Sequence, residues 1–409
     1  MLNSNKNKFD VIIIGAGVVG CYAAGALAQL GYEVCVLEKN AEAGSKSSCT
    51  GIISGECLDL FPTGRGAVQF EAHSAKVFSP SGQYIRIERN SPQAYVMDRP
   101  SLDRSVALQA LKNGACLHFS TLATSITVNS LSAEVYVTCL NKPIVFKAGI
   151  ILIAGGAGTT LTRDAGLGQI HEFAQGAQAE VACKDLAEVE IYSGAAIAPG
   201  FFSWLVPAGK SHAKAGLLCR GNPRPYITAL LSKLQRQGRI TMEKQDIKYG
   251  VVPLKPLGKT YGERLLVVGD AAGQVKPTTG GGIYFGTLCA CMAVTTIHEA
   301  FKAGNLSARG LSSYQRRWHK MLKQELSIDY WAHRFYRGLD DKQVEHIFNV
   351  IERHGIHESI LTSPDITFDW HGKAIFDALK YRSLQRSLEK LGMSPVPSVS
   401  EGKPHKRTA

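Results

Sequence analysis

The sequence predicts a mixed α/β fold, α+β overall, in which a nucleotide-binding parallel sheet is combined with an antiparallel sheet and a helical C-terminal region. Three observations lead to this fold class. A strand, a glycine-rich turn, a helix and a second strand follow one another in residues 9–38. Short alternating strands follow in residues 168–256, and after residue 297 the pattern is mainly helical to about residue 391. A chain of 409 residues is long enough for two or three domains.

The first unit has the spacing of a dinucleotide-binding turn. The apolar strand 9–14 leads into the turn GAGVVG at 15–20, and a helix then runs to about residue 30. Gly15 permits the tight turn, Gly17 lets a pyrophosphate approach the backbone, and Gly20 lets the helix pack closely on the strand. Because strand, turn and helix occur in the required order, the motif indicates a bound dinucleotide.

An acidic residue follows the second strand, which spans residues 34–37. Glu38 lies 18 positions beyond Gly20, where we expect a carboxylate to bind the adenosine ribose hydroxyls. The same carboxylate would repel a 2'-phosphate. The site should therefore prefer FAD or NAD to NADP, and Lys39 is also assigned to the cofactor.

The middle of the chain alternates between sheet and helix. Residues 76–87 predict a β-hairpin with a Pro-Ser-Gly turn. Asp98 ends a strand and caps a helix at 101–113, which stops at Gly114. Residues 149–154 form a buried strand that ends in GGAG. The chain is thus expected to leave the nucleotide-binding domain and return to it.

A second glycine-rich turn lies in residues 264–286, RLLVVGDAAGQVKPTTGGGIYFG. The apolar run 265–268 predicts a strand that delivers Asp270 to its C-terminal end. Glycines 280–282 then open an apolar helix that begins at Ile283 and runs to about residue 297. The uncapped amides of such a helix start form an anion-binding cradle.

This stretch resembles the GD motif of FAD-dependent monooxygenases and reductases with the p-hydroxybenzoate hydroxylase type of fold. Its continuation, KPTTGGGIYFG, is similar to the geranylgeranyl reductase family, whose members saturate isoprenoid double bonds. The resemblance extends over about residues 9–290. It implies a Rossmann-like FAD-binding domain, with Asp270 on a ribitol or ribose hydroxyl and the helix start facing the isoalloxazine. The residues assigned to FAD are Gly15, Gly17, Val19, Gly20, Glu38, Lys39, Arg99, Asp270, Gly280, Gly281, Gly282 and Ile283.

The resemblance also implies further site residues. Cys49-Thr50-Gly51 matches a loop beside the flavin, which makes Cys49 a candidate catalytic residue; a small buried hydrophobe is the alternative. Arg99 matches an Arg that reaches the FAD. Gly155 stands where many relatives have an Asp, so we do not expect this motif to recognise NADPH directly.

The sequence FFSWLVP at 201–207 resembles the family's aromatic-x-Trp-x-Phe-Pro signature. Strand alternation places Phe202, Trp204 and Val206 on one face, as an apolar wall for substrate. Ordinary core aromatics are the alternative. Downstream, Leu218 replaces the second glycine of the family's Gly-x-Gly.

We predict a discontinuous domain organisation. The FAD-binding domain comprises residues 1–65, 95–165 and 257–305, the substrate-binding sheet domain 66–94 and 166–256, and the helical C-terminal region 306–393, followed by a disordered tail at 394–409.

Composition narrows the class of protein. The ten cysteines show neither a zinc pattern nor a disulfide framework, so no metal site is predicted and a reducing cytoplasm fits best. The uncharged runs 11–32 and 277–297 have membrane-spanning length, but their glycines indicate buried nucleotide-binding elements. The polar N-terminus predicts no signal peptide.

Charge suggests partners. The formal net charge is +12, and residues 206–255 hold ten basic residues against two acidic ones, a local net charge of +8. This favours an anionic substrate or an acidic membrane face, which would make the protein cytoplasmic with peripheral membrane contact. Basic and aromatic residues in 309–336 would form either an interfacial surface or a capping bundle. No nucleic-acid-binding motif is present.

Three functions remain open. The first is an FAD-dependent reductase that saturates carbon-carbon double bonds of an isoprenoid, geranylgeranyl-type lipid. The second is an FAD-dependent aromatic or quinone monooxygenase, and the third is a flavin-linked electron-transfer protein at the membrane surface. NAD(P)H or a reduced ferredoxin-type carrier is the expected electron donor of the reductase.

Overall fold

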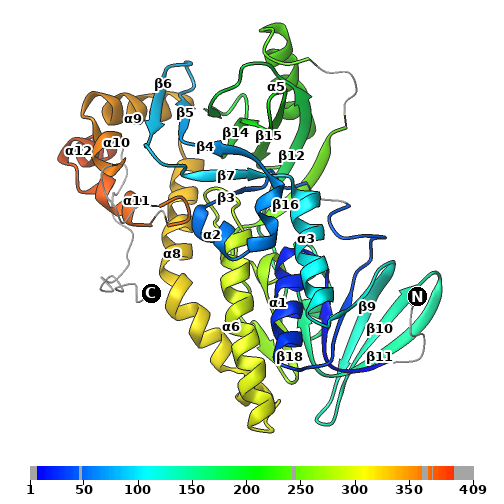
Figure 1. Cartoon of the computed structure of the whole chain (residues 1–409). Helices are drawn as coiled ribbons and strands as arrows, with labels where there is room; N and C mark the ends of the chain where they lie inside the picture. The colour runs from blue at the N-terminus through cyan, green and yellow to red at the C-terminus, as the bar shows by residue number, and fades with distance from the viewer. Residues whose placement is uncertain (1–6, 46–47, 242–245, 362–366, 371, 391–409) are drawn as a thin grey trace.

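The computed structural model describes residues 7–45, 48–241, 246–361, 367–370 and 372–390 (Figure 1). They form two large sheets, a small sheet between them and a series of C-terminal helices, which confirms the predicted fold class. The predicted disordered tail at 394–409 lies outside the described residues.

The larger sheet carries the predicted dinucleotide-binding unit. Its parallel core has the strand order β18-β11-β1-β2-β8, and β17 extends it antiparallel to β18. Strands β9 and β10 add an antiparallel extension to β11. The bounds are β1 Lys8–Ile14, β2 Val34–Leu37, β8 Cys116–His118, β9 Thr121–Val128, β10 Ala133–Cys139, β11 Lys142–Ile153, β17 Tyr261–Gly262 and β18 Leu265–Val267.

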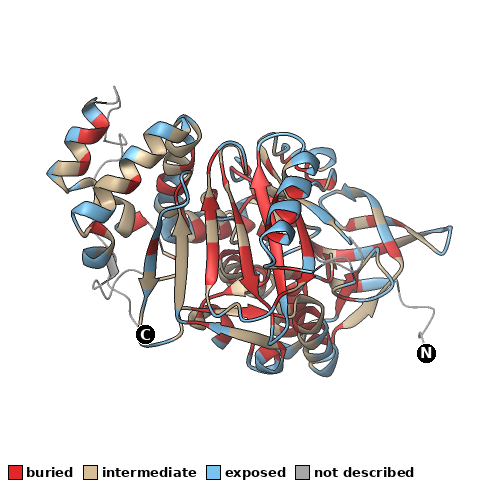
Figure 2. Ribbon diagram, turned by 90° about the horizontal axis from the view of Figure 1, so that it is seen from above, coloured by how far each residue is buried: buried red, intermediate tan, exposed pale blue. Residues whose placement is uncertain are grey.

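Three helices lie side by side against this sheet (Figure 1). They are α1 Val18–Gln29, α3 Arg99–Lys112 and α6 Ile283–Lys302, and their apolar residues share one core cluster with β1 and β2. Helix α6 begins at Ile283, as predicted. Helix α3 begins directly after its predicted N-cap Asp98, two residues earlier than the predicted start at residue 101. Figure 2 shows the central strands buried and the outer helix faces exposed.

The second sheet has seven strands in the order β16-β12-β15-β14-β13-β5-β6, all antiparallel except the β13–β5 pair. It includes the predicted hairpin around the Pro-Ser-Gly turn, formed by β5 and β6. The bounds are β5 Ser74–Phe78, β6 Tyr84–Glu88, β12 Phe173–Ala182, β13 Val189–Ser193, β14 Phe202–Pro207, β15 His212–Cys219 and β16 Lys248–Pro253.

Two parts of the chain differ from the expectation. Residues 168–256 were predicted to contain strands alone, which is wrong, because α5 (Arg224–Arg236) lies among them. Its buried residues Ile227, Leu230, Leu231 and Leu234 recur at helical spacing and pack on this sheet. The β9–β10 extension was not predicted at all, since β9 buries one of its 8 residues and so shows little hydrophobic alternation.

A small sheet of β3 (Ile52–Ile53), β7 (Ala94–Met97) and β4 (Val68–Ala72) lies between the two large ones (Figure 1). Short helical elements accompany the turns between strands. They are α2 Gly55–Asp59, the 3-10 helix η1 Pro62–Ala67, α4 Leu161–Asp164 and the 3-10 helix η2 Gly269–Ala272. Because β4 and β7 pair directly, residues 68–72 and 94–97 belong to one sheet; the predicted domain limits stay predictions.

The C-terminal region is helical, as predicted. The long helix α8 extends from beside α6 to the seven-stranded sheet (Figure 1). Trp318 is 1% exposed and donates to Thr260 Oγ1, while the Tyr330 hydroxyl donates to Glu172. These contacts fit a capping bundle better than an interfacial surface. The bounds are α7 Ala308–Leu311, α8 Ser313–Arg337, α9 Asp341–Arg353, α10 Ile356–Leu361, α11 Gly372–Leu379 and α12 Arg382–Lys390.

Among the described residues, α6 is the one helix long and apolar enough to cross a membrane by length and composition. In its most apolar window, 56% of the residues are buried inside the protein. It packs against α1, α8, η2 and α7, and we therefore describe it as a core helix.

Asp329 on α8 should make the protein less stable as the pH rises. It is fully buried, and desolvation, with help from the Glu325 carboxylate, raises its pKa to about 7. A raised pKa stabilises the folded state below the unfolded value of 3.8, and this contribution is lost as the pH rises towards 7. Asp329→Asn is expected to raise the unfolding free energy at pH 8 by up to about 4 kcal/mol.

Urea unfolding of both proteins at several pH values checks this. The variant should lose much of the decline in stability that the wild type shows between mildly acidic and neutral pH. An identical slope in the two proteins would contradict the prediction.

Candidate active site

The turn between β1 and α1 is built for close backbone approach. Gly15 has a φ of +108°, and a Cβ there would lie 2.5 Å from the carbonyl oxygen of Ala154. At Gly20 a Cβ would lie 2.1 Å from the Gly15 carbonyl oxygen. Gly17, by contrast, faces open space and caps α1 without a side-chain hydrogen bond. The helix start therefore presents free amides to a ligand.

Glu38 lies at the edge of this turn. Its Oε2 accepts a hydrogen bond of 2.9 Å from the Ala16 amide, and its Oε1 accepts one of 2.9 Å from the Asn40 amide. The carboxylate is thus held beside the glycine turn, where the sequence places the ribose. Lys39 is exposed next to it.

The second glycine-rich turn packs directly on the first. A Cβ at Gly282 would lie 2.7 Å from Asp270 Oδ1, and one at Gly286 would lie 2.9 Å from a methyl of Val19. Helix α6 begins after Gly282 without a side-chain cap. Burial raises the pKa of the Asp270 carboxyl, and the Arg99 guanidinium acts in the opposite direction.

These features fit FAD. Two uncapped helix starts, those of α1 and α6, are brought together through Val19. The carboxylates of Glu38 and Asp270 supply acceptors for hydroxyl groups, and Gly17 leaves the space that a phosphate needs. The individual roles of the twelve residues assigned to FAD stay predictions.

Arg99 lies between the cofactor residues and the candidate catalytic loop. Its Nη2 donates to Asp103 Oδ1 at 2.8 Å, and its side chain is 12% exposed. Burial disfavours its charge, but Asp103 and Cys49 together raise the pKa of Arg99 above its ordinary value. Gly51 packs on it so closely that a Cβ there would lie 2.8 Å from Arg99 Cγ.

Two buried polar residues of the seven-stranded sheet hold the Cys49 loop. Lys214 donates 2.8 Å hydrogen bonds to the carbonyl oxygens of Thr50 and Met97. Gln178 Oε1 accepts from the Thr50 hydroxyl at 2.6 Å and from the Trp204 indole at 3.3 Å. No sequence motif had pointed to Lys214 or Gln178. The available signal was a lysine in an otherwise apolar strand, KAGLLC.

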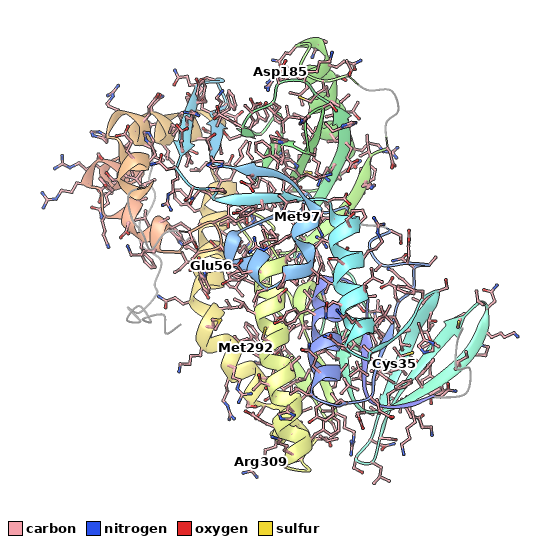
Figure 3. All side chains as sticks on the ribbon, in the orientation of Figure 1. Cys35, Glu56, Met97, Asp185, Met292 and Arg309 are labelled. Carbon is pink, nitrogen blue, oxygen red and sulfur yellow. The ribbon has the colours of Figure 1, made fainter. Side chains whose placement is uncertain are left out.

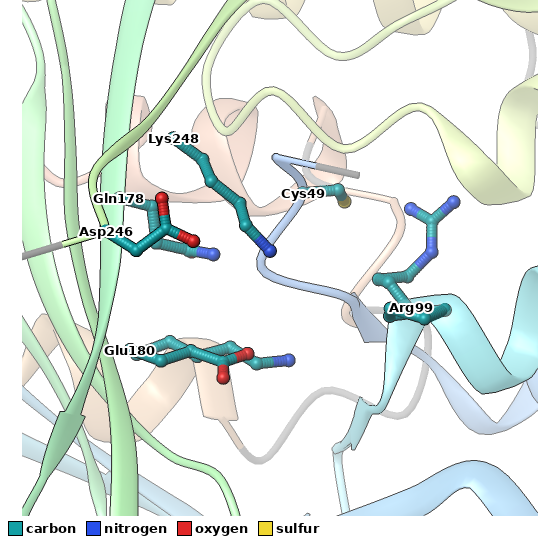
Figure 4. Close-up of a pocket in the computed structure, with 8 residues that line it drawn as sticks. Cys49, Arg99, Gln178, Glu180, Asp246 and Lys248 are labelled. Atoms are coloured by element: carbon teal, nitrogen blue, oxygen red, sulfur yellow. The ribbon is translucent and has the colours of Figure 1, made fainter. Parts of the chain in front are cut away.

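Cys49 is exposed and lines a pocket at this junction. Figure 4 shows it between Arg99, at the start of α3, and the side chains of Gln178, Glu180 and Lys248 from the sheet. The other lining residues are Pro100, Lys214 and Asp246. The exposure of Cys49 argues against the alternative of a buried core cysteine, and its catalytic role stays a prediction.

The predicted apolar wall lies on β14. The rings of Phe202 and Trp204 are 5.9 Å apart, and Val206 is fully buried. Trp204 lies flat over Gly216, since a Cβ there would be 2.5 Å from the indole Cζ2. Leu218 replaces the second glycine of the family's Gly-x-Gly and lies beside Gly280. A Cβ added at Gly280 would be 3.2 Å from Leu218 Cδ1.

Lys214→Met is expected to loosen the Cys49 loop. The substitution keeps the side-chain length but leaves two buried carbonyl oxygens without their donor, which costs about 1–3 kcal/mol. Cys49 should then react faster with a thiol reagent such as DTNB. The reaction rates of the folded variant and the folded wild type are compared. Lys248→Met, at an exposed pocket residue, is the control. Equal rates in both variants would argue against the proposed restraint.

Comparison with known proteins assigns the family. Residues 10–80 match the family of FAD-dependent oxidoreductases. The chain is 31% identical to digeranylgeranylglycerophospholipid reductase 2 of Methanothermobacter thermautotrophicus, over 84% of this chain and 92% of that protein. It is also 31% identical to the digeranylgeranylglycerophospholipid reductase of Methanocaldococcus jannaschii, over 82% and 88% of the respective chains.

The crystal structure of a geranylgeranyl bacteriochlorophyll reductase-like protein from Thermoplasma acidophilum has the same fold, with a TM-score of 0.82. The two sequences are 21% identical, and the match covers 95% of this chain and 100% of the other. The predicted family resemblance and the enzyme class are thereby confirmed. The chain belongs to the digeranylgeranylglycerophospholipid reductase family of FAD-dependent oxidoreductases.

Proposed function

We propose that the protein is an FAD-dependent reductase that saturates carbon-carbon double bonds in the isoprenoid chains of a geranylgeranyl-type lipid. The observation that carries this proposal is the joint position of the Cys49 loop and the apolar wall. Gln178 bonds both to Thr50 of the loop and to Trp204 of the wall. It also lines the pocket that contains Cys49 and Arg99, which supports a single site. The names of the two archaeal relatives point to the same substrate class.

When bound, FAD supplies the hydride for one alkene carbon. The chain must supply a proton for the other carbon, exclude water and align the bond. An isolated alkene develops no oxyanion that hydrogen bonds could stabilise, so alignment must provide most of the acceleration. Phe202 and Trp204 give the apolar surface for this, whereas Val206 is fully buried in the cluster on which Trp204 packs and offers no surface of its own. The uncapped start of α6 gives amides for negative charge on the cofactor. Cys49 is the candidate proton donor; shaping the pocket is its alternative role.

Anaerobic turnover tests the proposal. The purified flavoprotein is reduced with dithionite and incubated with geranylgeranyl lipids, and each saturated bond should add the mass of two hydrogen atoms. Free FAD under the same conditions is the control. No mass gain across several geranylgeranyl lipids would overturn the proposal. Consumption of oxygen with hydroxylation of a phenol would favour the monooxygenase alternative instead.

We propose NAD(P)H or a reduced ferredoxin-type carrier as the physiological electron donor. Stopped-flow flavin bleaching with each donor in turn decides between them. Bleaching by the carrier but not by NADH or NADPH would agree with Gly155, which offers no carboxylate at the position of the relatives' Asp.

We propose cytoplasmic localisation with peripheral membrane contact through exposed basic residues. Lys210, Arg220, Arg224, Lys233 and Arg236 are all exposed on or near α5. The apolar face of α5 is buried on the sheet, so contact would be electrostatic. Flotation with anionic liposomes should fall with rising salt. Flotation that does not depend on salt would contradict this form of contact, and it would also leave the electron-carrier alternative without support.

A further inference from the structure

A short segment from the C-terminal region reaches back to the cofactor-binding turn. Lys276 precedes the glycines at 280–282 and is 1% exposed. Its Nζ lies 2.8 Å from Asp369 Oδ1 and donates to the Phe368 carbonyl oxygen at 3.1 Å. The two residues are 93 positions apart in the sequence, so this buried ion pair is a tertiary link between distant parts of the chain.

The same segment touches both sides of the proposed site. Phe368 packs against the apolar cluster that contains Val206, and Trp204 packs against that cluster as well. Trp370 contacts the first turn of α6, with ring centroids 5.4 Å from Phe285 and 6.3 Å from Tyr284. Residues 368–370 therefore span from the apolar wall to the flavin-facing helix.

Neighbouring groups restrict the conformation of the Lys276 side chain. Gly281 lies under its side chain, since a Cβ there would be 2.7 Å from Lys276 Cε. Lys276 Nζ also lies 5.1 Å from the Phe368 ring centroid and 5.8 Å from that of Phe285. The first turn of α6 is itself fixed, because the Tyr284 hydroxyl donates to Glu56 at 2.8 Å; Figure 3 shows Glu56 where α2 approaches α6.

A buried lysine without a counter-charge is strongly unfavourable, and so is a buried aspartate without its cation. Asp369 is 4% exposed, and its second oxygen, Oδ2, has no hydrogen-bond partner among the described residues. The Asp369 carboxylate therefore depends on Lys276, whereas Lys276 also bonds the Phe368 carbonyl oxygen and lies near the Asp329 carboxylate. A displacement of residues 368–370 would separate the buried charges of Lys276 and Asp369. The position of Phe368 is therefore coupled to the turn at 280–282.

We propose that Phe368 is a specificity-determining residue that lines an isoprenoid slot together with Phe202 and Trp204 of the apolar wall. Lys276 and Asp369 are positioning residues that hold Phe368 there. This inference rests on the proposed function. It assigns the choice between isoprenoid chains to a segment outside both the FAD-binding turns and the substrate sheet.

Substrate competition in the holoenzyme tests Phe368. Phe368→Ala should keep the flavin content and absorption spectrum of the wild type. Its kcat/KM for geranylgeranyl lipids should fall about tenfold or more, mainly through KM, since an apolar contact surface is lost. The preference for geranylgeranyl over farnesyl lipids should shrink, because the longer chain loses the apolar contact that Phe368 makes with its additional isoprene unit. An unchanged ratio of the two kcat/KM values would overturn the assignment of Phe368.

The ion pair is tested by one single and one double variant. Asp369→Asn should reproduce the KM effect of Phe368→Ala and speed hydrogen exchange of the backbone amides of residues 368–370. If this single variant does not fold, Lys276→Met/Asp369→Leu removes both charges and restores an apolar interior. The double variant should fold and bind FAD, with the altered chain preference. Lys373→Met, which breaks the exposed pair with Asp377 on α11, is the matched control and should change neither readout.

The outcomes separate the two proposals. A wild type that reduces no isoprenoid lipid overturns the proposed function and the slot with it, whatever the exchange rates. A wild type that reduces these lipids, together with variants of unchanged KM, preference and exchange, overturns this inference alone.

Discussion

Gly20→Ala is expected to destabilise the protein by about 3 kcal/mol or more and to abolish FAD binding. The new methyl group would lie 2.1 Å from the Gly15 carbonyl oxygen, and a backbone atom cannot move aside as a flexible side chain can. Helix α1 would have to shift away from β1, and its free amides would move with it. Thermal unfolding of the apoprotein and titration with FAD measure the two effects.

Gly17→Ala separates stability from binding. No atom lies within 4 Å of a Cβ at Gly17, and its φ of −72° is allowed for alanine. The variant should therefore unfold close to the wild-type temperature, while its FAD affinity falls about tenfold or more, because the methyl group occupies the space left for the phosphate. Wild-type affinity in Gly17→Ala would show that this turn does not hold the pyrophosphate.

Gly216→Ala is expected to remove most of the lipid-reducing activity while FAD stays bound. The methyl group would lie 2.5 Å from the Trp204 ring and 2.8 Å from its Nε1, so the indole must leave the sheet surface. Its hydrogen bond to Gln178 would break, and the contact of Gln178 with Thr50 beside Cys49 would be disturbed. We expect a loss of about a hundredfold in kcat/KM, since small displacements of an aligned substrate reduce rates strongly.

A second substitution checks the cause. Trp204→Ala removes the ring that would collide, so Gly216→Ala/Trp204→Ala should be no worse than Trp204→Ala alone. Steady-state kinetics with flavin occupancy measured in parallel distinguish this from loss of cofactor. A double variant whose losses simply multiply would contradict the steric explanation.

Much of the fold was readable from local pattern. The strand, glycine turn and helix around Gly17 were correctly predicted, as was the start of α6 at Ile283, because backbone turns of this kind demand glycine at fixed positions. Local pattern did not predict α5, whose helical periodicity lies among strands, or β9, which buries one of its 8 residues and gives little signal.

The site was predicted less completely than the fold. Motifs pointed to Arg99, Asp270 and the aromatic wall on β14, and the structure places Arg99 and Asp270 near one another. Lys214 and Asp369 carry no motif, since each acts through a partner far away in the sequence: Thr50 for the first and Lys276 for the second. Spacing along one strand or loop contains no information about such partners.

The sequence by itself determined the two glycine-rich turns and the helices that follow them, and so predicted a dinucleotide between them, because glycine spacing and helix starts are local properties of the backbone. Only the tertiary structure decided what surrounds that cofactor site. Lys214 ties the Cys49 loop to the sheet, and Asp369 brings residues 368–370 from the C-terminal region to the apolar wall. Both are buried charges, and a buried charge is stable only beside a partner that folding delivers.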